Sequence, residues 1–357
     1  MKDEFEKLGD VAANVVATLT PTPDYAAIIK QVPPNITPYH MASREQWLRG
    51  RGTTIGASDL PALFGLHKYK TPFQLYAEKS GQYTLEFPKA DIREWSIHVP
   101  PAERGNLMEG PAFELLRWLR PEWTVVPNQI PGGFVFVDRS ARMSSTPDVF
   151  VFGPNDRKST VQIKSMTDYV FKEDWNVNGE PEVPLSVAIQ CIADATLSNC
   201  DKAYAAALVM GFNFELYLFE VPMHAGTMAK SRELVADFWD RVEDERPYPP
   251  DYSRDGDVIA SLYSHDDGTE IDLTNDTRVS EIIPEYTALK AREKDGSDAE
   301  KARKVMDAEL LHRIGNATTA RLGDGLVLTA KTIRRKPYSV EASSYRPIKI
   351  GPPKVKK

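Results

Sequence analysis

Short runs rich in β-branched and aromatic residues recur along the middle of the chain, and each run predicts a β-strand. Around them, apolar residues recur every three or four positions, which is the spacing of an amphipathic helix. The last two strands are joined by Gly211-Phe212-Asn213, a short loop typical of a hairpin. The predicted strands are residues 123–130, 133–137, 148–153, 160–164, 203–210 and 214–221, and the predicted helices are residues 58–64, 111–119, 187–197 and 227–242.

The mixture of the two patterns predicts an α/β fold in which helices flank a mixed central β-sheet. Residues 1–40 combine an Ala/Val-rich stretch with several prolines, and we interpret them as an N-terminal arm or linker. Residues 41–250 carry the alternating patterns and form the predicted main domain. Residues 251–357 predict a helical hairpin, a short β segment and a basic tail, and the charge of that tail suits contact with DNA and simple solvation about equally.

Composition narrows the class of protein. The chain has 357 residues, of which 41% are hydrophobic, so it can form one large domain with an appendage or two domains. Without an apolar run near the ~20 residues of a membrane helix, and with a charged N-terminus, it is expected to be soluble and cytoplasmic. A net charge of −7 means that contact with nucleic acid must depend on local patches. Cys191 and Cys200 lack paired spacing and are expected to be buried apolar residues.

Polar residues in two successive predicted strands indicate a chemical site. Asp148 opens one strand, and Gln162 and Lys164 are two residues apart on the next, so both side chains project from the same face. A hairpin would bring all three to one point. Oxygen ligands suit Mg²⁺, and a lysine beside the metal can orient water and offset negative charge during phosphodiester hydrolysis. Taken alone, however, this pattern more often belongs to an ordinary hairpin with a polar solvent face.

Glu109 is the candidate for a third oxygen ligand. Pro111 is expected only in the first turn of a helix, which places Glu109 at or just before the helix N-terminus. The positive end of the helix would then help to keep its carboxylate ionised. An ordinary first-turn acid is the alternative. The apolar stripe that predicts this helix consists of Ala112, Leu115, Leu116 and Leu119.

Several separate blocks occur in the order found in one nuclease family. From about Trp47 to Val221 the chain resembles the YqaJ-like, lambda-exonuclease-like viral recombinase family of the PD-(D/E)xK nuclease superfamily. The blocks that carry the resemblance are Arg51…Ile55-Gly56-Ala57-Ser58-Asp59…Gly65, Leu75…Lys79-x-Gly81, Gly105…Glu109…Ala112, Thr146-Pro147-Asp148…Gln162-x-Lys164 and Pro184…Gln190.

The resemblance implies a restriction-endonuclease-like core with an Mg²⁺-dependent centre that could also take Mn²⁺. Glu109 and Asp148 match the family's metal-binding acids, and Lys164 matches its catalytic lysine. Gln162 occupies the position of a second strand acid, and the carbonyl of Ile163 would complete the metal shell. The residues implied to hold a terminal 5′-phosphate are Arg51, Ser58, Thr146 (or Ser145) and Gln190.

Gln162 departs from the family pattern. Its amide oxygen can bind a hard cation but brings no charge, so weaker metal binding is expected. The resemblance implies an exonuclease that resects double-stranded DNA ends from the 5′ side and leaves a 3′ strand for a single-strand annealing protein. By the same analogy it would act as a ring-like homotrimer in the cytoplasm of a phage-infected bacterium. The alternative is a DNA-end-binding scaffold for recombination whose nuclease centre is impaired by Gln162.

Overall fold

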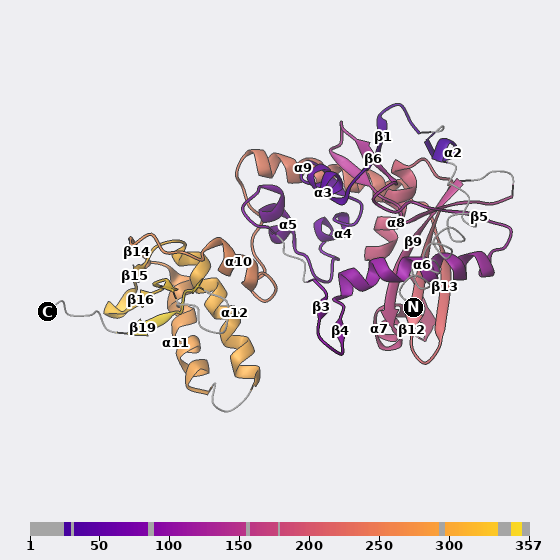
Figure 1. Ribbon diagram of the computed structural model, residues 1–357. Coiled ribbons are helices and arrows are strands. Elements are labelled where there is room, and N and C mark those ends of the chain that lie inside the picture. Colours follow the sequence, from indigo (N-terminus) through magenta and orange to yellow (C-terminus); the bar gives the residue numbers. More distant parts are fainter. Residues whose placement is uncertain are drawn as a thin grey trace, which may run out of the picture. The chain divides into compact units, whose positions relative to one another are not determined.

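The fold is seen in a computed structural model of the chain (Figure 1). It divides into two compact units, one of Met1–Pro61 with Phe87–Ala236 and one of Ala62–Glu86 with Asp237–Lys357. The expected border at residue 250 is therefore not where the units part. No helix among the described residues is long and apolar enough to cross a membrane. The structure describes residues 25–29, 32–84, 89–154, 158–177, 179–292, 297–334 and 344–351.

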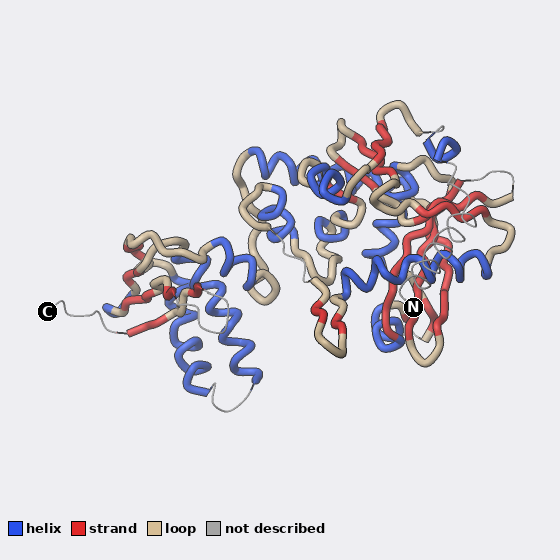
Figure 2. Tube along the Cα trace, in the orientation of Figure 1, coloured by secondary structure: helices blue, strands red, loops and turns tan. Residues whose placement is uncertain are grey.

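A five-stranded mixed sheet forms the centre of the first unit, as Figure 2 shows in red. The strand order is β13-β12-β9-β8-β5; β9 and β12 run parallel, and the other neighbours are antiparallel. The expected α/β fold with a mixed sheet and flanking helices is confirmed. The strands are β5 (Thr124–Pro127), β8 (Val149–Phe152), β9 (Lys158–Thr167), β12 (Lys202–Met210) and β13 (Phe214–Val221).

Helices cover both faces of this sheet, and the side chains of β9 point alternately toward one helix or the other. Val161 and Ile163 belong to an apolar cluster with α6 (Pro101–Leu119). The alternate residues of a strand face the other way. Lys164 accordingly contacts α8 (Leu185–Leu197), through Gln190. The face that carries Gln162 and Lys164 is therefore the α8 face.

A second sheet of the first unit includes part of the expected N-terminal arm. Its order is β1-β6-β7-β2, and β1 pairs antiparallel with β6 from Ile36↔Asp138 to His40↔Phe134. The last five residues of the expected linker are thus an edge strand. The elements of this region are α2 (Tyr25–Ile29), β1 (Ile36–His40), α3 (Arg44–Arg51), β2 (Ile55–Gly56), β6 (Phe134–Asp138) and β7 (Met143–Ser145).

Helix α2 is attached to the first unit through a buried lysine. The Nζ of Lys158 donates hydrogen bonds to the carbonyls of Ile28, 3.0 Å away, and Ser198, 2.7 Å away. These carbonyls lie at the C-terminal ends of α2 and α8, where a positive charge is favourable. Ile28 itself is fully buried. Residues 25–29 are therefore part of the folded unit, whereas residues 1–24 of the expected arm lie outside the described residues.

The pattern-based elements correspond well to the structure. All six predicted strands are confirmed, and so are the predicted helices, which correspond to α4 (Leu60–Leu63), α6, α8 and α9 (Ala225–Glu243). Other elements had no clear periodicity in the sequence. They are α5 (Pro72–Lys79), β3 (Asp91–Ile92), β4 (Ile97–His98), α7 (Asp168–Asp174), β10 (Asn176–Val177), β11 (Glu180–Pro181) and α10 (Gly256–Leu262).

The second unit contains the expected helical hairpin and short β segment. Helices α11 (Thr277–Arg292) and α12 (Ser297–Ile314) pack against a sheet of order β14-β15-β16-β19 in one apolar cluster. Glu309 of α12, which is buried, forms ion pairs with Arg278 and Arg313. The strands are β14 (Glu270–Asp272), β15 (Thr319–Arg321), β16 (Val327–Thr329), β17 (Ile333–Arg334), β18 (Ser344–Tyr345) and β19 (Lys349–Gly351), with a 3-10 turn at Gly323–Gly325.

Part of the expected basic tail belongs to the fold of this unit. The Arg346 guanidinium donates hydrogen bonds to four backbone carbonyls, and β19 pairs with β16. Arg346 is therefore a structural residue rather than a member of a solvated arm. Residues 335–343 and 352–357 lie outside the described residues. The four carbonyls belong to Tyr263, Gly315, Ala317 and Ala330.

Replacing Arg346 should destabilise the second unit. Arg346→Ala leaves four backbone carbonyls without their hydrogen-bond donor. We expect it to lower the free energy of unfolding by roughly 2–4 kcal/mol. Lys331→Ala, which alters an exposed basic residue of the same region, is the control. Chemical denaturation of both variants would check this. Equal stability of the two would show that Arg346 is an ordinary surface charge.

Candidate active site

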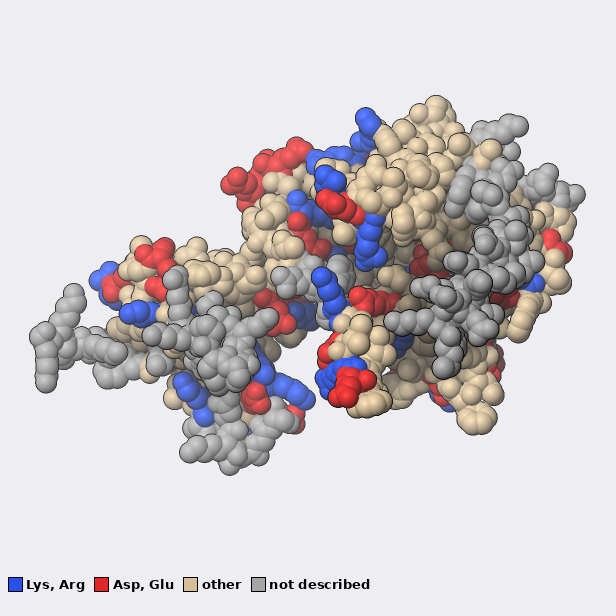
Figure 3. Space-filling model, viewed as in Figure 1, with Lys and Arg blue, Asp and Glu red and all other residues tan. Residues whose placement is uncertain are grey.

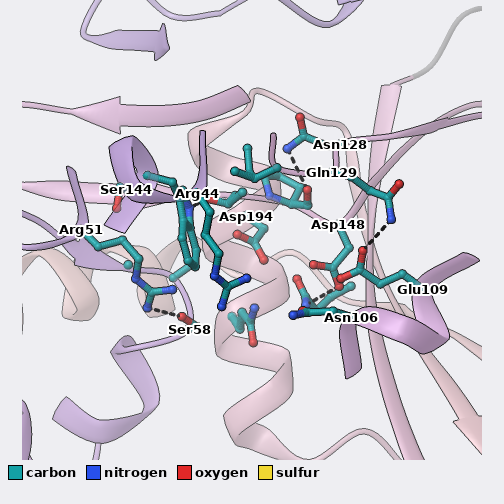
Figure 4. Close-up of a pocket in the computed structure, with 18 of the residues that line it drawn as sticks. Arg44, Arg51, Ser58, Asn106, Glu109, Asn128, Gln129, Ser144, Asp148 and Asp194 are labelled. Carbon is teal, nitrogen blue, oxygen red and sulfur yellow. Dashed lines mark hydrogen bonds between the residues drawn. The ribbon is translucent and has the colours of Figure 1, made fainter. Parts of the chain in front are cut away.

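The β8–β9 hairpin brings Asp148, Gln162 and Lys164 to one polar cavity of about 370 Å³ (Figure 4). The Asp148 Oδ2 accepts hydrogen bonds from the Nε2 of Gln162, at 2.5 Å, and from the backbone N–H of Ile163, at 2.7 Å. The predicted meeting of these three side chains is confirmed. They do not form the polar solvent face of an ordinary hairpin, because they face this cavity and Gln162 is only 6% exposed.

The end of the β8–β9 ladder explains why Asp148 takes this position. Pairing ends at Val149↔Val161, and the next bonded pair in this register would join Pro147 to Ile163. Pro147 has no N–H to donate to the Ile163 carbonyl. The Asp148 side chain accepts the Ile163 N–H in place of a strand partner. Because the N–H and C=O of one strand residue point to the same side, the Ile163 carbonyl also faces the end of β8.

Gln162 has an unused acceptor at this point. Its Nε2 donates to Asp148, whereas its Oε1 is buried and has no hydrogen-bond partner among the described residues. Leaving a buried polar atom unsatisfied costs about 1–3 kcal/mol. Such an atom in a polar cavity marks a place where a water molecule or a bound ion can supply the missing interaction.

Glu109 lines the same cavity, but its helix does not begin where the sequence suggested. Helix α6 starts ten residues before Pro111, so Glu109 is in the helix interior and the expected effect of a helix N-terminus is wrong. Proline is tolerated there because Gly110 has no Cβ to clash with its ring. Pro111 and Leu107 are also exposed, so water can satisfy the Leu107 carbonyl that lost its N–H partner.

The two acids oppose each other's ionisation. Burial, followed by the charge of Asp148, raises the pKa of Glu109 to about 7, although a hydrogen bond from Gln129 at 3.1 Å acts in the opposite direction. Burial also raises the pKa of Asp148, while Lys164 and the hydrogen bonds from Ile163 and Gln162 lower it. The pair therefore holds excess negative potential that a bound cation would relieve.

Asn128 fixes the backbone on either side of Asp148. Its backbone N–H donates to the Asp148 carbonyl and its side-chain Nδ2 donates to the Pro147 carbonyl, both at 2.9 Å. The same Nδ2 donates to the Phe134 carbonyl, and Asn128 is 2% exposed. This residue was not predicted from the sequence. Its signal was an asparagine after a proline within the predicted strand 123–130, at the point where β5 ends.

The predicted phosphate-binding residues line another part of this cavity. The Arg51 Nη2 donates to the Ser58 hydroxyl at 3.0 Å and forms an ion pair with buried Asp59 at 3.2 Å. Trp47 joins this group to the loop before Asp148, because its indole N–H donates to the Thr146 hydroxyl at 3.2 Å. Arg51, Ser58 and Thr146 are thus brought together. The expected set contained an arginine and neutral donors only, whereas the structure adds the carboxylate of Asp59, which lowers the net positive charge of this group.

Trp47 and Arg44 were not predicted as site residues, yet both line the cavity. The guanidinium carbons of Arg44 and Arg51 lie 5.7 Å and 4.9 Å from the centre of the Trp47 ring, within the range of cation–π contacts. The signal in the sequence was the spacing of these residues. Positions 44, 47 and 51 share one face of a helix, and α3 has no buried residue that would have revealed it as an amphipathic helix.

Helix α8 contributes Gln190 and an acid that was not predicted from the sequence. The Gln190 Oε1 accepts a hydrogen bond from the Lys164 Nζ at 2.9 Å. One turn later, Asp194 is 1% exposed and accepts a hydrogen bond from the Ser145 hydroxyl at 2.7 Å. Ser145 is thus occupied, and of the two alternatives Thr146 lines the cavity. The signal for Asp194 was a carboxylate in a mostly apolar helix, four residues after Gln190.

Asp194 is held in its ionised form only weakly. Burial raises the pKa of Asp194 to about 7, although the hydrogen bond from the Ser145 hydroxyl lowers it. Its second oxygen, Oδ2, has no hydrogen-bond partner among the described residues. Three acids with raised pKa values therefore line one cavity, a concentration that is typical of functional sites.

In the part of the chain that is described, cysteine and histidine side chains form no alternative metal-binding group. Cys191 and Cys200 are free and buried, as expected, and burial raises the pKa of both thiols. No group of three His, Cys, Asp or Glu side chains in the described ranges is arranged to hold a metal ion. Any cation in this cavity would need the amide oxygen of Gln162 or a backbone carbonyl in addition to the carboxylates.

Several known proteins resemble the chain, and three of them show the range of similarity. The protein named "Uncharacterized protein YqaJ" from Bacillus subtilis (strain 168) is 25% identical over 292 residues, which cover 79% of this chain and 82% of the relative. An alkaline exonuclease from Laribacter hongkongensis superposes with a TM-score of 0.42 and 16% identity, covering 57% of this chain and 94% of that one. A phage-related exonuclease from Haemophilus somnus 129PT gives a TM-score of 0.32 and 13% identity, covering 54% and 96%.

The cavity residues lie almost entirely within one stretch that matches a known family. Residues 46–201 match the family described as "YqaJ-like viral recombinase domain", and the match includes every predicted site residue. Residues of four of the five blocks, from Arg51 to Gln190, line one cavity, which agrees with that match. Residues 46–201 of the chain are therefore similar to the YqaJ-like viral recombinase domain family.

Proposed function

We propose that this domain is a divalent-metal-dependent exonuclease that resects double-stranded DNA ends from the 5′ end. One observation carries the proposal: the Asp148–Gln162–Lys164 group and the Arg51–Ser58–Thr146 group line the same cavity. The first group suits phosphodiester hydrolysis, and the second suits a terminal phosphate. A cavity with both would bind a strand by its end and cleave it nearby.

The donors around Asp148 fit a hard cation such as Mg²⁺ or Mn²⁺. All of these metal-ligating atoms are oxygens. The Nε2 of Gln162 contacts the Asp148 carboxylate, so the unpartnered Oε1 of the same amide lies close to it. Asp148, Glu109, the Gln162 Oε1 and the Ile163 carbonyl would hold the ion. When bound, the ion would polarise the scissile phosphate and acidify a water molecule. Lys164 would offset charge that develops on the phosphate.

In this proposal Arg51 is the main residue that binds the 5′-phosphate at the end of the strand. A guanidinium binds phosphate through charge-assisted hydrogen bonds, and the hydroxyls of Ser58 and Thr146 add neutral donors. Basic and acidic side chains are interspersed on the face shown in Figure 3, in agreement with the net charge of −7. Affinity for DNA would therefore depend on the arginines of the cavity rather than on a broad basic surface.

Cleavage of linear duplex DNA tests this function directly. Duplexes labelled at the 5′ or the 3′ end, incubated with Mg²⁺ or Mn²⁺, should release nucleotides from the 5′ end and leave a 3′ single strand. That product is what a single-strand annealing protein would bind. Binding of DNA ends without release of nucleotides would instead support the scaffold alternative.

The first prediction from this function concerns the metal requirement of Gln162→Glu. The substitution adds a negative charge beside the proposed ion, and we expect half-maximal cleavage at a roughly tenfold lower Mg²⁺ concentration, about 1.4 kcal/mol. Without metal, the same substitution replaces a donor to Asp148 by a second carboxylate and should lower stability. Metal titrations of cleavage and thermal unfolding in EDTA measure the two effects.

Asp148→Asn and Lys164→Ala are the loss-of-function comparisons for these titrations. Each removes a charge from the proposed centre, and cleavage should fall by roughly 10²-fold or more. If Asp148→Asn cuts at the parental rate and Gln162→Glu leaves the metal requirement unchanged, the hairpin is not the centre of the reaction.

A second prediction concerns recognition of the 5′-phosphate. Arg51→Ala should reduce the preference for 5′-phosphorylated over 5′-hydroxyl duplexes, because it removes an interaction of roughly 1.5–3 kcal/mol. Arg49→Ala is a matched control on the same helix, since Arg49 is exposed and pairs with Glu45 at 3.3 Å. Competition cleavage of the two duplexes gives the ratio. An unchanged ratio in Arg51→Ala would place end recognition elsewhere.

A third prediction concerns pH. Because the folded pKa of Glu109, about 7, exceeds its ordinary value of 4.5, the metal-free protein should lose stability as the pH rises through about 7. A cation competes with that proton, so Mn²⁺ should bind more tightly at pH 8 than at pH 6 and should release protons. Calorimetric titrations in two buffers measure this. Glu109→Gln should reduce the pH dependence, of which Asp194 keeps a share because its pKa is also raised to about 7. An undiminished dependence in that variant would contradict the assignment.

A further inference from the structure

Asp194 is a buried acid of the cavity that has no part in the proposed reaction. It is 1% exposed and lies on α8 one turn after Gln190. One of its oxygens accepts from the Ser145 hydroxyl at 2.7 Å, and the other has no hydrogen-bond partner among the described residues. Burying such a carboxylate lowers stability. A carboxylate that lowers stability and yet lines the cavity suggests that Asp194 contributes to function.

The neighbours of Gln190 require one orientation of its side-chain amide. The ammonium group of Lys164 can only donate, so the atom facing it at 2.9 Å must be the Gln190 oxygen. The carboxylate of Asp194 can only accept. It lies one turn further along α8 and lines the same cavity, so the part of Gln190 that can bind it is the amide nitrogen. The contact with Lys164 fixes the orientation of the amide, and the position of Asp194 on the next turn suits the nitrogen end.

We propose that Asp194 is a positioning residue: it holds the Gln190 amide so that the oxygen fixes Lys164 beside Asp148 and the nitrogen faces the cavity. An amide nitrogen has two hydrogens, so one can be donated to Asp194 and the other to a terminal phosphate. The bond from Ser145 holds Asp194 in turn and connects α8 to the segment that precedes Asp148. This inference rests on the proposed nuclease function.

The variants Asp194→Ala and Asp194→Asn separate positioning from ordinary structural support. Asp194→Ala removes the acceptor, and we expect kcat to fall about tenfold with KM for DNA changing little, because Lys164 acts at the reacting centre. Its thermal stability at pH 8 should be equal to that of the parent or higher, since a buried carboxylate is lost. Asp194→Asn keeps an acceptor oxygen in the same volume and should restore most of kcat.

A double-mutant cycle tests whether Asp194 acts through Gln190. In a Gln190→Ala background, Asp194→Ala should lower kcat by less than about twofold, because the amide that it positions is absent. Ser145→Ala is the matched control: it removes the other partner of Asp194, and Asp194→Ala should still lower kcat in that background. A second readout needs no cleavage. In EDTA, Asp194→Ala should bind 5′-phosphorylated and 5′-hydroxyl duplexes with more similar affinities than the parent does.

The outcomes separate the inference from the function on which it rests. If the parent protein does not cleave linear duplex DNA with either metal, the proposed function fails. If the parent cleaves, the positioning role is overturned by an equal fall in kcat in the parent and Gln190→Ala backgrounds. The positioning role is also overturned if the loss of thermal stability in Asp194→Ala is large enough to account for its whole loss of activity.

Discussion

The hydrogen bond from the Ile163 N–H to the Asp148 carboxylate is the interaction on which the site depends. It closes the β8–β9 ladder at the point where Pro147 cannot continue it, and so fixes an acid at the end of the sheet. The alternation of β9 then directs Gln162 and Lys164 to the α8 face, while Val161 and Ile163 remain in the apolar cluster under α6. A proline next to an aspartate therefore acts in two ways, because it ends the pairing and leaves the Ile163 carbonyl without a strand donor.

The cavity concentrates groups that a stable fold would ordinarily avoid. Glu109, Asp148 and Asp194 all have raised pKa values, and the amide oxygen of Gln162 is buried without a partner among the described residues. Each of these features weakens the folded state unless a ligand is bound. A divalent cation would remove two of the penalties together, since it neutralises the acids and accepts the amide oxygen as a ligand. Glutamine at position 162 has a further consequence: it stabilises the metal-free site by donating to Asp148, which glutamate could not do.

The sequence predicted the parts of the site that are local. Runs of β-branched and aromatic residues located β8 and β9, and the hairpin expected from these runs was enough to place Asp148, Gln162 and Lys164 together. The family resemblance added Arg51, Ser58 and Thr146, which lie in the same cavity. Other features depend on tertiary contacts that leave little trace in the sequence. Helix α3 has no buried stripe, so neither the helix nor the role of Trp47 could be inferred from periodicity. Helix α6 continues through Pro111 because Gly110 and solvent exposure accommodate it, which is why the local rule misplaced Glu109.

The most direct test of this account is the position of a bound metal ion. Crystals grown without divalent cations and soaked in Mn²⁺ should show an anomalous peak between the Asp148 carboxylate and the Gln162 Oε1, at oxygen distances of about 2.0–2.3 Å. The account predicts this peak in the parent protein and its loss in Asp148→Asn. A peak at another place in the domain, or none beside Asp148 in a soaked crystal that retains Mn²⁺ elsewhere, would contradict it.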